Sequence, residues 1–192
     1  MRIAIEGNIG SGKTTQLDMI SRLGIPVYKE PVHLWPLEEF YQDPERNAFL
    51  MQTTVLTTFP DQGPGVYERS TLASRMVFST LKHPQEVLTY GMLYNRIGWN
   101  PDFWIFLESS PELCHRRVQR RNGPGDSKVT LDYLQKLDQK YRDMYEHVKS
   151  RAFVVNADRP ASEVFKTIMA IINEHCSGYP DSLVRDTPGS EP

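Results

Sequence analysis

The sequence predicts an α/β fold in which a five-stranded parallel sheet is flanked by helices on both faces. Three observations over its 192 residues lead to this class. Short strand-like segments alternate with segments of helical periodicity, as in doubly wound sheets. Most of the strand-like segments are apolar, which is typical of parallel strands that are buried on both faces. A glycine-rich loop joins the first strand to the first helix, and ligands of such sheets bind at the carboxyl ends of the strands.

The expected elements follow one another along most of the chain. Strands are expected at residues 1–6, 25–29, 65–70, 103–108 and 152–156. Helices are expected at residues 13–23, 36–41, 44–59, 73–81, 109–121, 131–149 and 161–175. The last segment is rich in Pro, Ser, Gly and charged residues, a composition that cannot build a packed core. We therefore expect one domain over residues 1–176 and a disordered tail over residues 177–192.

Composition narrows the classes of partner and location. The formal net charge is −2 and the pI is about 6.2, so the chain lacks the basic excess of a protein that wraps nucleic acid. Cys114 and Cys176 stand far apart without metal-ligand spacing, which indicates packing residues in a reducing compartment. No run of 18 apolar residues occurs. The expectation is a protein without membrane spans in the cytoplasm, or in the host cytoplasm if the source is a virus.

The loop after the first strand reads GNIGSGKTT and fits the phosphate-binding pattern G-x-x-x-x-G-K-[ST]. Its glycines let successive backbone N–H groups turn toward phosphate oxygens, Lys13 adds a positive charge, and Thr14 offers an oxygen ligand for Mg²⁺. A strand before the loop and a helix after it supply the context that the motif requires. The residues expected to hold the nucleotide are Gly7, Asn8, Ile9, Gly10, Ser11, Gly12, Lys13, Thr14 and Thr15.

Two carboxylates are expected at the same edge of the sheet as this loop. Glu30 ends the second strand, because Pro31 favours extended backbone in the residue before it. Glu68 stands near the end of the third strand and is followed by Arg69. The carboxyl ends of parallel strands share one edge, so both carboxylates should lie beside the bound phosphates. Ionisable groups in such a place are candidates for catalysis.

Several motifs together resemble the deoxynucleoside kinase family. They are IEGNIGSGKTT, EPVHLW, FYQDPERNAFLMQ, YERS and PDFWIFLESSPELC, in the order and spacing of the family, and the resemblance covers roughly residues 1–176. The chain is similar in particular to the pyrimidine-accepting branch, which includes mitochondrial thymidine kinase and a broad-specificity insect enzyme. The resemblance implies a P-loop kinase with an arginine-bearing lid, which transfers the γ-phosphoryl group of ATP to the 5′-hydroxyl of a deoxynucleoside.

The resemblance also implies roles for residues around the phosphate loop. Glu30 would be the general base on the 5′-hydroxyl, and Arg69 would reach the 5′ end of the substrate and the transferring phosphate. Lys13 would bind the β- and γ-phosphates, while Thr14 and Glu68 would hold Mg²⁺. The strand at 103–108 does not end in an Asp of the Walker-B type. Its absence strengthens the expectation that Glu68 is the carboxylate that holds Mg²⁺. The catalytic set, including two lid arginines, is Glu30, Lys13, Arg69, Arg117 and Arg121.

A nucleoside pocket is implied by the same resemblance. Family positions that bind the base and sugar correspond to Ile9, Trp35, Tyr41, Gln52 and Phe78. Gln52 would pair with the base edge through its amide, Phe78 would stack on the base, and Trp35 would line the wall. Tyr41 would bind the 3′-hydroxyl of the sugar. These residues join Glu30 and Arg69 as expected substrate contacts.

The choice of base is expected to depend on three uncharged positions. The family positions that read the cytosine edge in the deoxycytidine-preferring branch hold Phe59 and Ser74, and Val55 lines the same space. This leaves room for a thymine methyl group and no charge that demands an exocyclic amine. We therefore expect thymidine and deoxycytidine to be better substrates than purine deoxynucleosides.

The predicted lid, at about residues 116–129, departs from the family pattern. Arg117 and Arg121 stand where two of three family arginines are expected, and would neutralise charge that develops on the γ-phosphate. Gly123 stands in place of the third arginine. Asp126 replaces the glutamate that touches the 3′-hydroxyl and is one methylene shorter. A looser lid and a weaker sugar contact are the expected consequences.

Partners and rival functions complete the sequence predictions. By resemblance we expect a homodimer. The apolar stretch MVFSTL is compatible with a place in the dimer interface, and packing in the core explains it equally well. Feedback binding of thymidine triphosphate is carried as a hypothesis. The nearest rival is a thymidylate kinase, which usually has a D-R-Y type motif in place of ERS and lacks E-P-V-x-x-W. A nucleotide-binding switch needs no base-stacking pocket, and a polynucleotide 5′ kinase is disfavoured by the weak basic balance.

Overall fold

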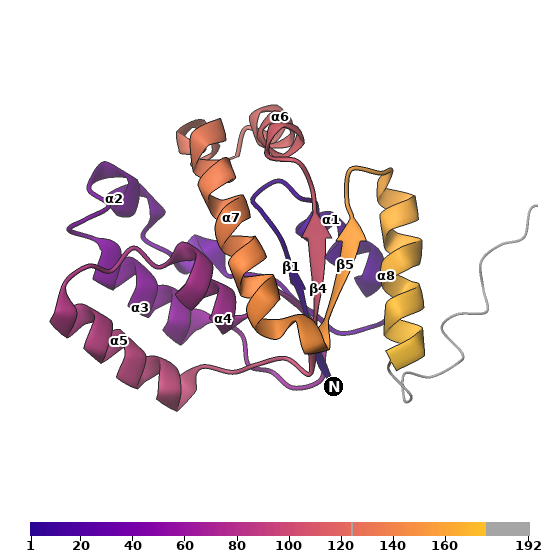
Figure 1. The fold of residues 1–192 in the computed structure, drawn as a ribbon, viewed down its shortest axis with the longest axis horizontal. Helices are drawn as coiled ribbons and strands as arrows, with labels where there is room; N and C mark the ends of the chain where they lie inside the picture. The colour runs from indigo at the N-terminus through magenta and orange to yellow at the C-terminus, as the bar shows by residue number, and fades with distance from the viewer. Residues whose placement is uncertain (124, 176–192) are drawn as a thin grey trace, which may run out of the picture.

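The computed structural model describes residues 1–123 and 125–175, and strands form one parallel sheet (Figure 1). They are β1 (Arg2–Glu6), β2 (Val27–Tyr28), β3 (Gly65–Glu68), β4 (Phe103–Glu108) and β5 (Ala152–Asn156). Their order across the sheet is β2-β3-β1-β4-β5, so the first strand lies at the centre. The predicted five-stranded α/β class is confirmed.

The strand register brings the carboxyl ends of the strands to one edge of the sheet. Ile5 of β1 lies opposite Glu68 of β3 and Ile105 of β4. Glu108, the last residue of β4, lies opposite Asn156, the last residue of β5. The loop that follows β1 therefore begins beside the carboxylate that ends β3, as the sequence predicted.

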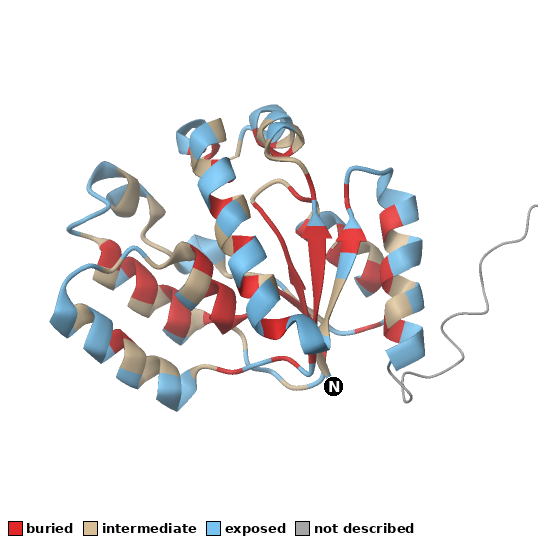
Figure 2. Cartoon of the chain, in the orientation of Figure 1, coloured by how far each residue is buried: buried red, intermediate tan, exposed pale blue. Residues whose placement is uncertain are grey.

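Helices cover both faces of this sheet. α1 (Lys13–Ser21) and α8 (Ala161–His175) pack on one face, where their buried aliphatic side chains join those of the strands in one core cluster. α7 (Leu131–Val148), α4 (Thr71–Ala73) and the π-helical turn η2 (Ser74–Phe78) pack on the other face. Buried residues line the strands and the inner sides of the helices, and exposed residues line their outer sides (Figure 2).

A third group of helices lies beside the half of the sheet that holds β2 and β3 (Figure 1). It consists of α2 (Leu37–Gln42), α3 (Ala48–Thr58) and α5 (Pro84–Ile97). An aromatic-rich cluster of buried residues joins α3 to β3, and its members are Met51, Val55, Phe59, Tyr67 and Trp99. The remaining elements are η1 (Val32–Leu34), α6 (Pro111–Arg121), η3 (Asp126–Lys128) and η4 (Lys149–Arg151).

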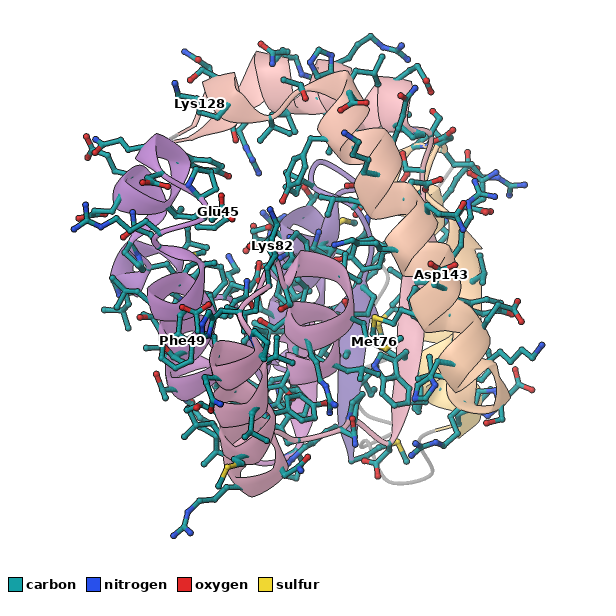
Figure 3. The ribbon with its side chains drawn as sticks, turned by 60° about the vertical axis from the view of Figure 1, so that its left-hand side comes forward. Glu45, Phe49, Met76, Lys82, Lys128 and Asp143 are labelled. Atoms are coloured by element: carbon teal, nitrogen blue, oxygen red, sulfur yellow. The ribbon has the colours of Figure 1, made fainter. Side chains whose placement is uncertain are left out.

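Two segments differ from the prediction. β2 ends at Tyr28, so Glu30 lies in the connection beyond the strand and not at its last residue. The segment 73–81 is not one helix, because the chain runs from α4 into η2 and leaves helical geometry at Ser79. Met76 of η2 packs with the cluster under α7 (Figure 3), so the stretch MVFSTL contributes to the core.

The sequence prediction omitted α5. Pro84 at its first turn and Glu86 are ordinary helix-start signals, but the apolar residues of this helix do not form one buried stripe. Tyr90 is buried, whereas Val87, Leu88 and Met92 are exposed. The sequence of α5 therefore lacks the regular spacing of apolar residues by which most of the other helices were predicted.

The remaining sequence predictions are met in part. Cys114 is buried, as expected of a packing residue. Cys176 and the tail predicted over residues 177–192 lie outside the described residues. Within the described chain, every helix is too short or too polar to cross a membrane.

Candidate active site

The phosphate loop between β1 and α1 has positive φ angles at its three glycines, and at two of them a side chain would also clash. Gly7 and Gly10 both have positive φ angles, of 139° and 84°. A Cβ on Gly7 would lie 2.7 Å from the carbonyl oxygen of Leu107, and a Cβ on Gly10 would lie 2.6 Å from that of Cys114. The loop is thus pressed against the end of β4 and against α6, and no side chain fits at either glycine.

Lys13 and Asn8 hold the loop from within. The Nζ of Lys13 donates to the carbonyl oxygens of Gly7 and Asn8, each at 2.9 Å. The side chain of Asn8 donates to the carbonyl oxygen of Leu134 in α7 at 2.8 Å, and it accepts from the Ile9 N–H at 2.9 Å. The loop is therefore anchored to a helix on the far face of the sheet.

Thr14 and Glu68 form an oxygen-rich pair at the foot of the loop. The Thr14 hydroxyl donates to Oε1 of Glu68 at 2.6 Å, and Glu68 is buried at the end of β3. Hydroxyl and carboxylate oxygens suit Mg²⁺, which in nucleotide sites takes one or two carboxylates together with phosphate oxygens. No cluster of three or more His, Cys, Asp or Glu suited to a metal occurs in residues 1–123 and 125–175. The pair therefore fits Mg²⁺ that arrives with a nucleotide, and does not fit a metal held by the protein alone.

Glu30 and Arg69 face each other at the carboxyl edge of the sheet. Oε1 of Glu30 lies 3.2 Å from Nη1 of Arg69, and both side chains are largely buried. The Arg69 guanidinium lies over the ring of Phe78, 4.0 Å from the ring centre, in a cation–π contact. Arg69 also has a φ of 65°, a left-handed conformation that costs free energy for a residue with a side chain. Strain of this kind persists only where the surrounding structure enforces it.

Burial shapes the ionisation of this centre. It is the largest influence on Glu30 and raises the pKa of that carboxyl, against the attraction of Arg69. Burial, together with the positive charge of Arg69, lowers the pKa of Lys13 to about 8. A phosphate bound beside Lys13 would supply the negative charge that favours its protonated form. The buried carboxylates of Glu30 and Glu68 thus lie at the same edge of the sheet as the buried cations Lys13 and Arg69.

Of the predicted base-binding residues, Gln52 contacts Phe78 and Trp35 contacts the end of α3. The Gln52 side chain donates from Nε2 to the carbonyl oxygen of Phe78 at 3.0 Å. Its Oε1 is buried and has no hydrogen-bond partner among the described residues, so an acceptor is left open. Trp35 donates from its indole nitrogen to the Thr58 hydroxyl at 3.0 Å and packs on the aromatic cluster of α3. One N–H of the Gln52 amide is engaged by protein, which the sequence had not anticipated.

The predicted specificity residues are all buried. Val55 and Phe59 follow Gln52 along one face of α3 and belong to the aromatic cluster with Trp99. Ser74 is buried in η2.

An exposed ion pair between Glu45 and Lys82, 3.6 Å apart, links the α2–α3 connection to the segment before α5 (Figure 3).

Arg117 binds the phosphate loop at the base of the predicted lid. Its guanidinium donates to the carbonyl oxygen of Ala157 at 2.9 Å, and it reaches the Ser109 hydroxyl at 3.4 Å and the carbonyl oxygen of Ser11 at 3.5 Å. Asp158 accepts from the Ser109 hydroxyl at 2.6 Å. Arg117 therefore joins α6, the phosphate loop and the connection after β5.

The outer part of the predicted lid pairs with itself. Arg121 donates from Nε and Nη2 to the two carboxylate oxygens of Asp126, at 2.9 Å and 2.6 Å. The Gly123 N–H donates to the same carboxylate at 2.7 Å. The ring of Tyr41 lies against Gly125, where a Cβ would come within 3.1 Å of it. The predicted sugar contacts Tyr41 and Asp126 are thus brought to the same place, and Arg121 does not point freely into the site.

Sequence reasoning missed two buried residues of this centre. Glu6, the last residue of β1, is fully buried and accepts from the N–H and hydroxyl of Ser70 at 2.8 Å and 2.6 Å. Tyr141 of α7 is buried beside Phe78, with the two rings 6.1 Å apart and edge to face. A carboxylate that ends an apolar strand directly before a phosphate loop was the available signal for Glu6. Tyr141 sits in a regular helical stripe and gave no signal.

Comparisons with known proteins agree with this geometry. The family model named deoxynucleoside kinase matches residues 3–177. The thymidine kinase of Ictalurid herpesvirus 1 (strain Auburn) is 29% identical over 201 residues, which cover 92% of this chain and 86% of that protein. Deoxyadenosine kinase of Dictyostelium discoideum is 32% identical over 165 residues, which cover 76% of this chain and 67% of that protein.

A solved structure shows the same fold. It is deoxyadenosine kinase from M. mycoides with the products dCMP and a flexible dCDP bound. It superposes with a TM-score of 0.80 at 26% identity, over 91% of this chain and 99% of that one. The family model spans nearly the whole described chain, and the phosphate loop lies where such a kinase needs it. The chain belongs to the deoxynucleoside kinase family, whose members are phosphotransferases with an alcohol group as acceptor.

Proposed function

We propose that this protein phosphorylates the 5′-hydroxyl of deoxynucleosides with ATP, in nucleotide salvage for DNA synthesis. One observation carries the proposal. A buried carboxylate, Glu30, faces the buried cation Arg69 at the sheet edge that also holds the phosphate loop. Oε1 of Glu30 is the oxygen that lies 3.2 Å from Nη1 of Arg69, and it accepts no hydrogen bond within the described chain, so a hydroxyl group of a ligand can donate to it beside Arg69. The family assignment supports the same reaction.

In this proposal Glu30 is the general base. Phosphoryl transfer needs aligned oxygens, neutralised charge and an acceptor for the proton of the nucleophile. Burial raises the pKa of Glu30 above its ordinary value, which strengthens it as a base, while Arg69 favours the ionised form that must accept the proton. Arg69 would then bind both the 5′ end of the substrate and the transferring phosphoryl group from the side, leaving the line of attack free.

The donor side is held by the loop residues, Gly7 to Thr15. Lys13 donates to two carbonyl oxygens of its own loop, and it would donate to phosphate oxygens when a nucleotide binds there. The N–H groups of the loop would supply further donors. Thr14 and Glu68 would hold Mg²⁺, which when bound neutralises phosphate charge. Arg117 lies at the loop already, and Arg121 becomes available when it leaves Asp126.

On the acceptor side we propose that Gln52 binds the base edge, Phe78 stacks on the base, and Ile9 and Trp35 line the pocket. Tyr41 and Asp126 would bind the 3′-hydroxyl. Val55, Phe59 and Ser74 offer a buried wall without charge, which favours thymidine and deoxycytidine over purines. The deoxyadenosine kinase from M. mycoides holds dCMP, so a relative of this chain accommodates a pyrimidine nucleotide.

Two further traits are part of the proposal. Thymidine triphosphate would act as a feedback ligand, with its phosphates on the loop and its base in the acceptor pocket.

A homodimer would form through α5, because Leu88 and Met92 lie one helical turn apart and are 59% and 67% exposed. Size-exclusion chromatography with light scattering tests the dimer, and Met92→Lys should yield monomers. A cytoplasmic location stays a prediction of the sequence.

A coupled assay with ATP, four deoxynucleosides and their monophosphates tests the proposed function. We expect turnover with thymidine and deoxycytidine, weaker turnover with purines, and none with monophosphates. Turnover of thymidine monophosphate but not thymidine would make the protein a monophosphate kinase. ATP binding without turnover of any acceptor would favour a switch module.

A further inference from the structure

Four buried polar atoms without hydrogen-bond partners in the described chain surround the catalytic centre. They are Oε2 of Glu6, Oε1 of Glu30, Nε of Arg69 and the hydroxyl of Tyr141. Burial works against the charge of Arg69, and the carboxylates of Glu30 and Glu6 favour it. Each buried unpaired group costs free energy, so a concentration of them around one guanidinium needs an explanation. The proposed function uses Glu30 and Arg69 and leaves Glu6 without a role.

Glu6 completes the hydrogen bonding of the turn that carries Arg69. The N–H of Arg69 donates to the carbonyl oxygen of Ile5 at 3.0 Å, which is the last bond that β3 makes to β1 by its backbone. The next N–H, that of Ser70, donates to the side chain of Glu6 at 2.8 Å. A side-chain carboxylate thus replaces the backbone acceptor at the point where the chain leaves the sheet.

The same carboxylate oxygen is part of a buried network. The Ser70 hydroxyl donates to it at 2.6 Å, and the indole nitrogen of the buried Trp104 lies 3.3 Å from that hydroxyl. These contacts fix the residue that follows Arg69, and so they enforce its left-handed φ of 65°. The second oxygen of Glu6 accepts no hydrogen bond within the described chain, and the attraction of Arg69 opposes the burial that raises the pKa of this carboxyl.

We infer that Glu6 is a positioning residue for Arg69, holding the strained turn with one carboxylate oxygen and attracting the guanidinium with the other. The inference rests on the proposed function, in which Arg69 touches the reacting phosphoryl group. In this role Glu6 fixes the backbone that follows Arg69 and attracts its guanidinium. Arg69 is thereby kept over Phe78 and 3.2 Å from Glu30. Glu6 does not touch the substrate.

A structural residue at this place would not need a charge. Burial raises the pKa of Glu6 to about 7, although the Ser70 hydroxyl, Arg69 and Lys13 all act in the opposite direction. Glutamine could accept the same two hydrogen bonds from Ser70 without burying a carboxylate. The charge therefore serves Arg69 and not the stability of the turn.

The Glu6→Gln variant tests this inference in steady-state assays with thymidine and ATP. We expect kcat to fall by about 10²-fold, because Arg69 is misplaced, while the KM for ATP stays within about threefold. Glu163→Gln, an exposed acid on α8, is the matched control and should retain wild-type kinetics. Thermal unfolding at pH 8 adds a second readout, since a structural residue would lose stability as well as activity, whereas Glu6→Gln should not lose stability.

Coupling to Arg69 is tested in a double-mutant cycle. In an Arg69→Lys background, Glu6→Gln should cost less than about threefold, because the residue through which it acts is already altered. Equal losses in both backgrounds would overturn the inference. If Glu6→Gln does not fold, Ser70→Ala takes its place in the cycle, with a smaller loss and the same dependence on Arg69.

Failure of the proposed function is distinguishable from failure of this inference. If the wild type phosphorylates no deoxynucleoside, the proposed function is wrong, and crystal structures of the wild type and Glu6→Gln decide the positioning role. The guanidinium of Arg69 should leave the Phe78 ring in the variant. An unchanged Arg69 in that structure, or an active variant within about twofold of wild type, would refute the role of Glu6.

Discussion

The catalytic centre and the predicted lid both contain an arginine–carboxylate pair, and the two pairs differ in how they are satisfied. At the centre, Glu30 and Arg69 lie 3.2 Å apart, yet Oε1 of Glu30 and Nε of Arg69 make no hydrogen bond within the described residues. In the lid, Arg121 and Asp126 form two hydrogen bonds to each other, and Gly123 adds a third. The centre is left open for a ligand, whereas the lid is complete without one.

This difference in hydrogen bonding indicates different roles for the catalytic centre and the lid in binding a ligand. Buried atoms that lack partners cost free energy until a ligand supplies them, so the centre is preorganised for the reaction. The lid pair joins a half-exposed guanidinium to a buried carboxylate, since the side chains of Arg121 and Asp126 are 55% and 6% exposed, so Asp126 needs a new partner when Arg121 leaves it. In the proposed closed state phosphate would take up Arg121 and the sugar hydroxyl would take up Asp126, so that neither group loses a partner.

The largest expected effect is at the centre. Glu30→Gln should lower kcat by about 10²- to 10⁴-fold, because the proton of the 5′-hydroxyl loses its acceptor. ATP binding, measured by calorimetry, should be unchanged, since the phosphate loop is untouched. Turnover within a few-fold of wild type would remove Glu30 from its assigned role.

The second effect concerns the pH dependence of stability. The pKa of Glu6 is raised from its ordinary value near 4.5 to about 7, so the folded state holds this proton more tightly than the unfolded state. Its stabilising contribution is full below pH 4.5 and is lost as the pH rises through 7, by roughly 3 kcal/mol. Glu6→Gln should gain stability relative to wild type between pH 4.5 and pH 8, as measured by urea unfolding. A constant difference across this range would contradict the raised pKa.

The third effect is at the lid and is smaller. Asp126→Asn should raise the KM for thymidine by about tenfold with little change in kcat, because it weakens a hydrogen bond to bound sugar. Thymidine that lacks the 3′-hydroxyl provides the control and should be insensitive to the substitution. Equal losses on both nucleosides would place the effect in the lid ion pair and not in a sugar contact.

The smallest effect is a proton count on the donor side. Burial lowers the pKa of Lys13 to about 8, and bound phosphate should raise it. ATP binding at pH 8 should therefore take up about half a proton, and at pH 6.5 almost none from this group. Calorimetry in buffers of different ionisation enthalpy measures the uptake. Equal uptake at both pH values would show that Lys13 is not the group involved.

The sequence predicted much of the fold because the strands are apolar and the phosphate loop has a fixed pattern. It missed α5, whose exposed Val87, Leu88 and Met92 blur the helical stripe. It extended the second strand to Glu30, although two residues of β2 suffice for the sheet.

In the candidate site, the sequence identified residues that make local motifs and missed contacts that depend on distant chain segments. Thr14 and Glu68 were predicted to hold the same Mg²⁺, and the structure brings them within hydrogen-bond distance of each other. The bond from Gln52 to the Phe78 carbonyl joins two helices, so its geometry could not be read from spacing. Glu6 was hidden because its importance lies in the turn at Ser70, 64 positions away. The roles of all these residues stay predictions.

A crystal structure with thymidine and a non-hydrolysable ATP analogue tests the central claim most directly. We expect the 5′-hydroxyl within about 3 Å of the Glu30 carboxylate, with the base between Gln52 and Phe78 and the phosphates on the loop that holds Lys13. A nucleoside bound elsewhere, or a Glu30 carboxylate turned away from the 5′-hydroxyl in that complex, would contradict it.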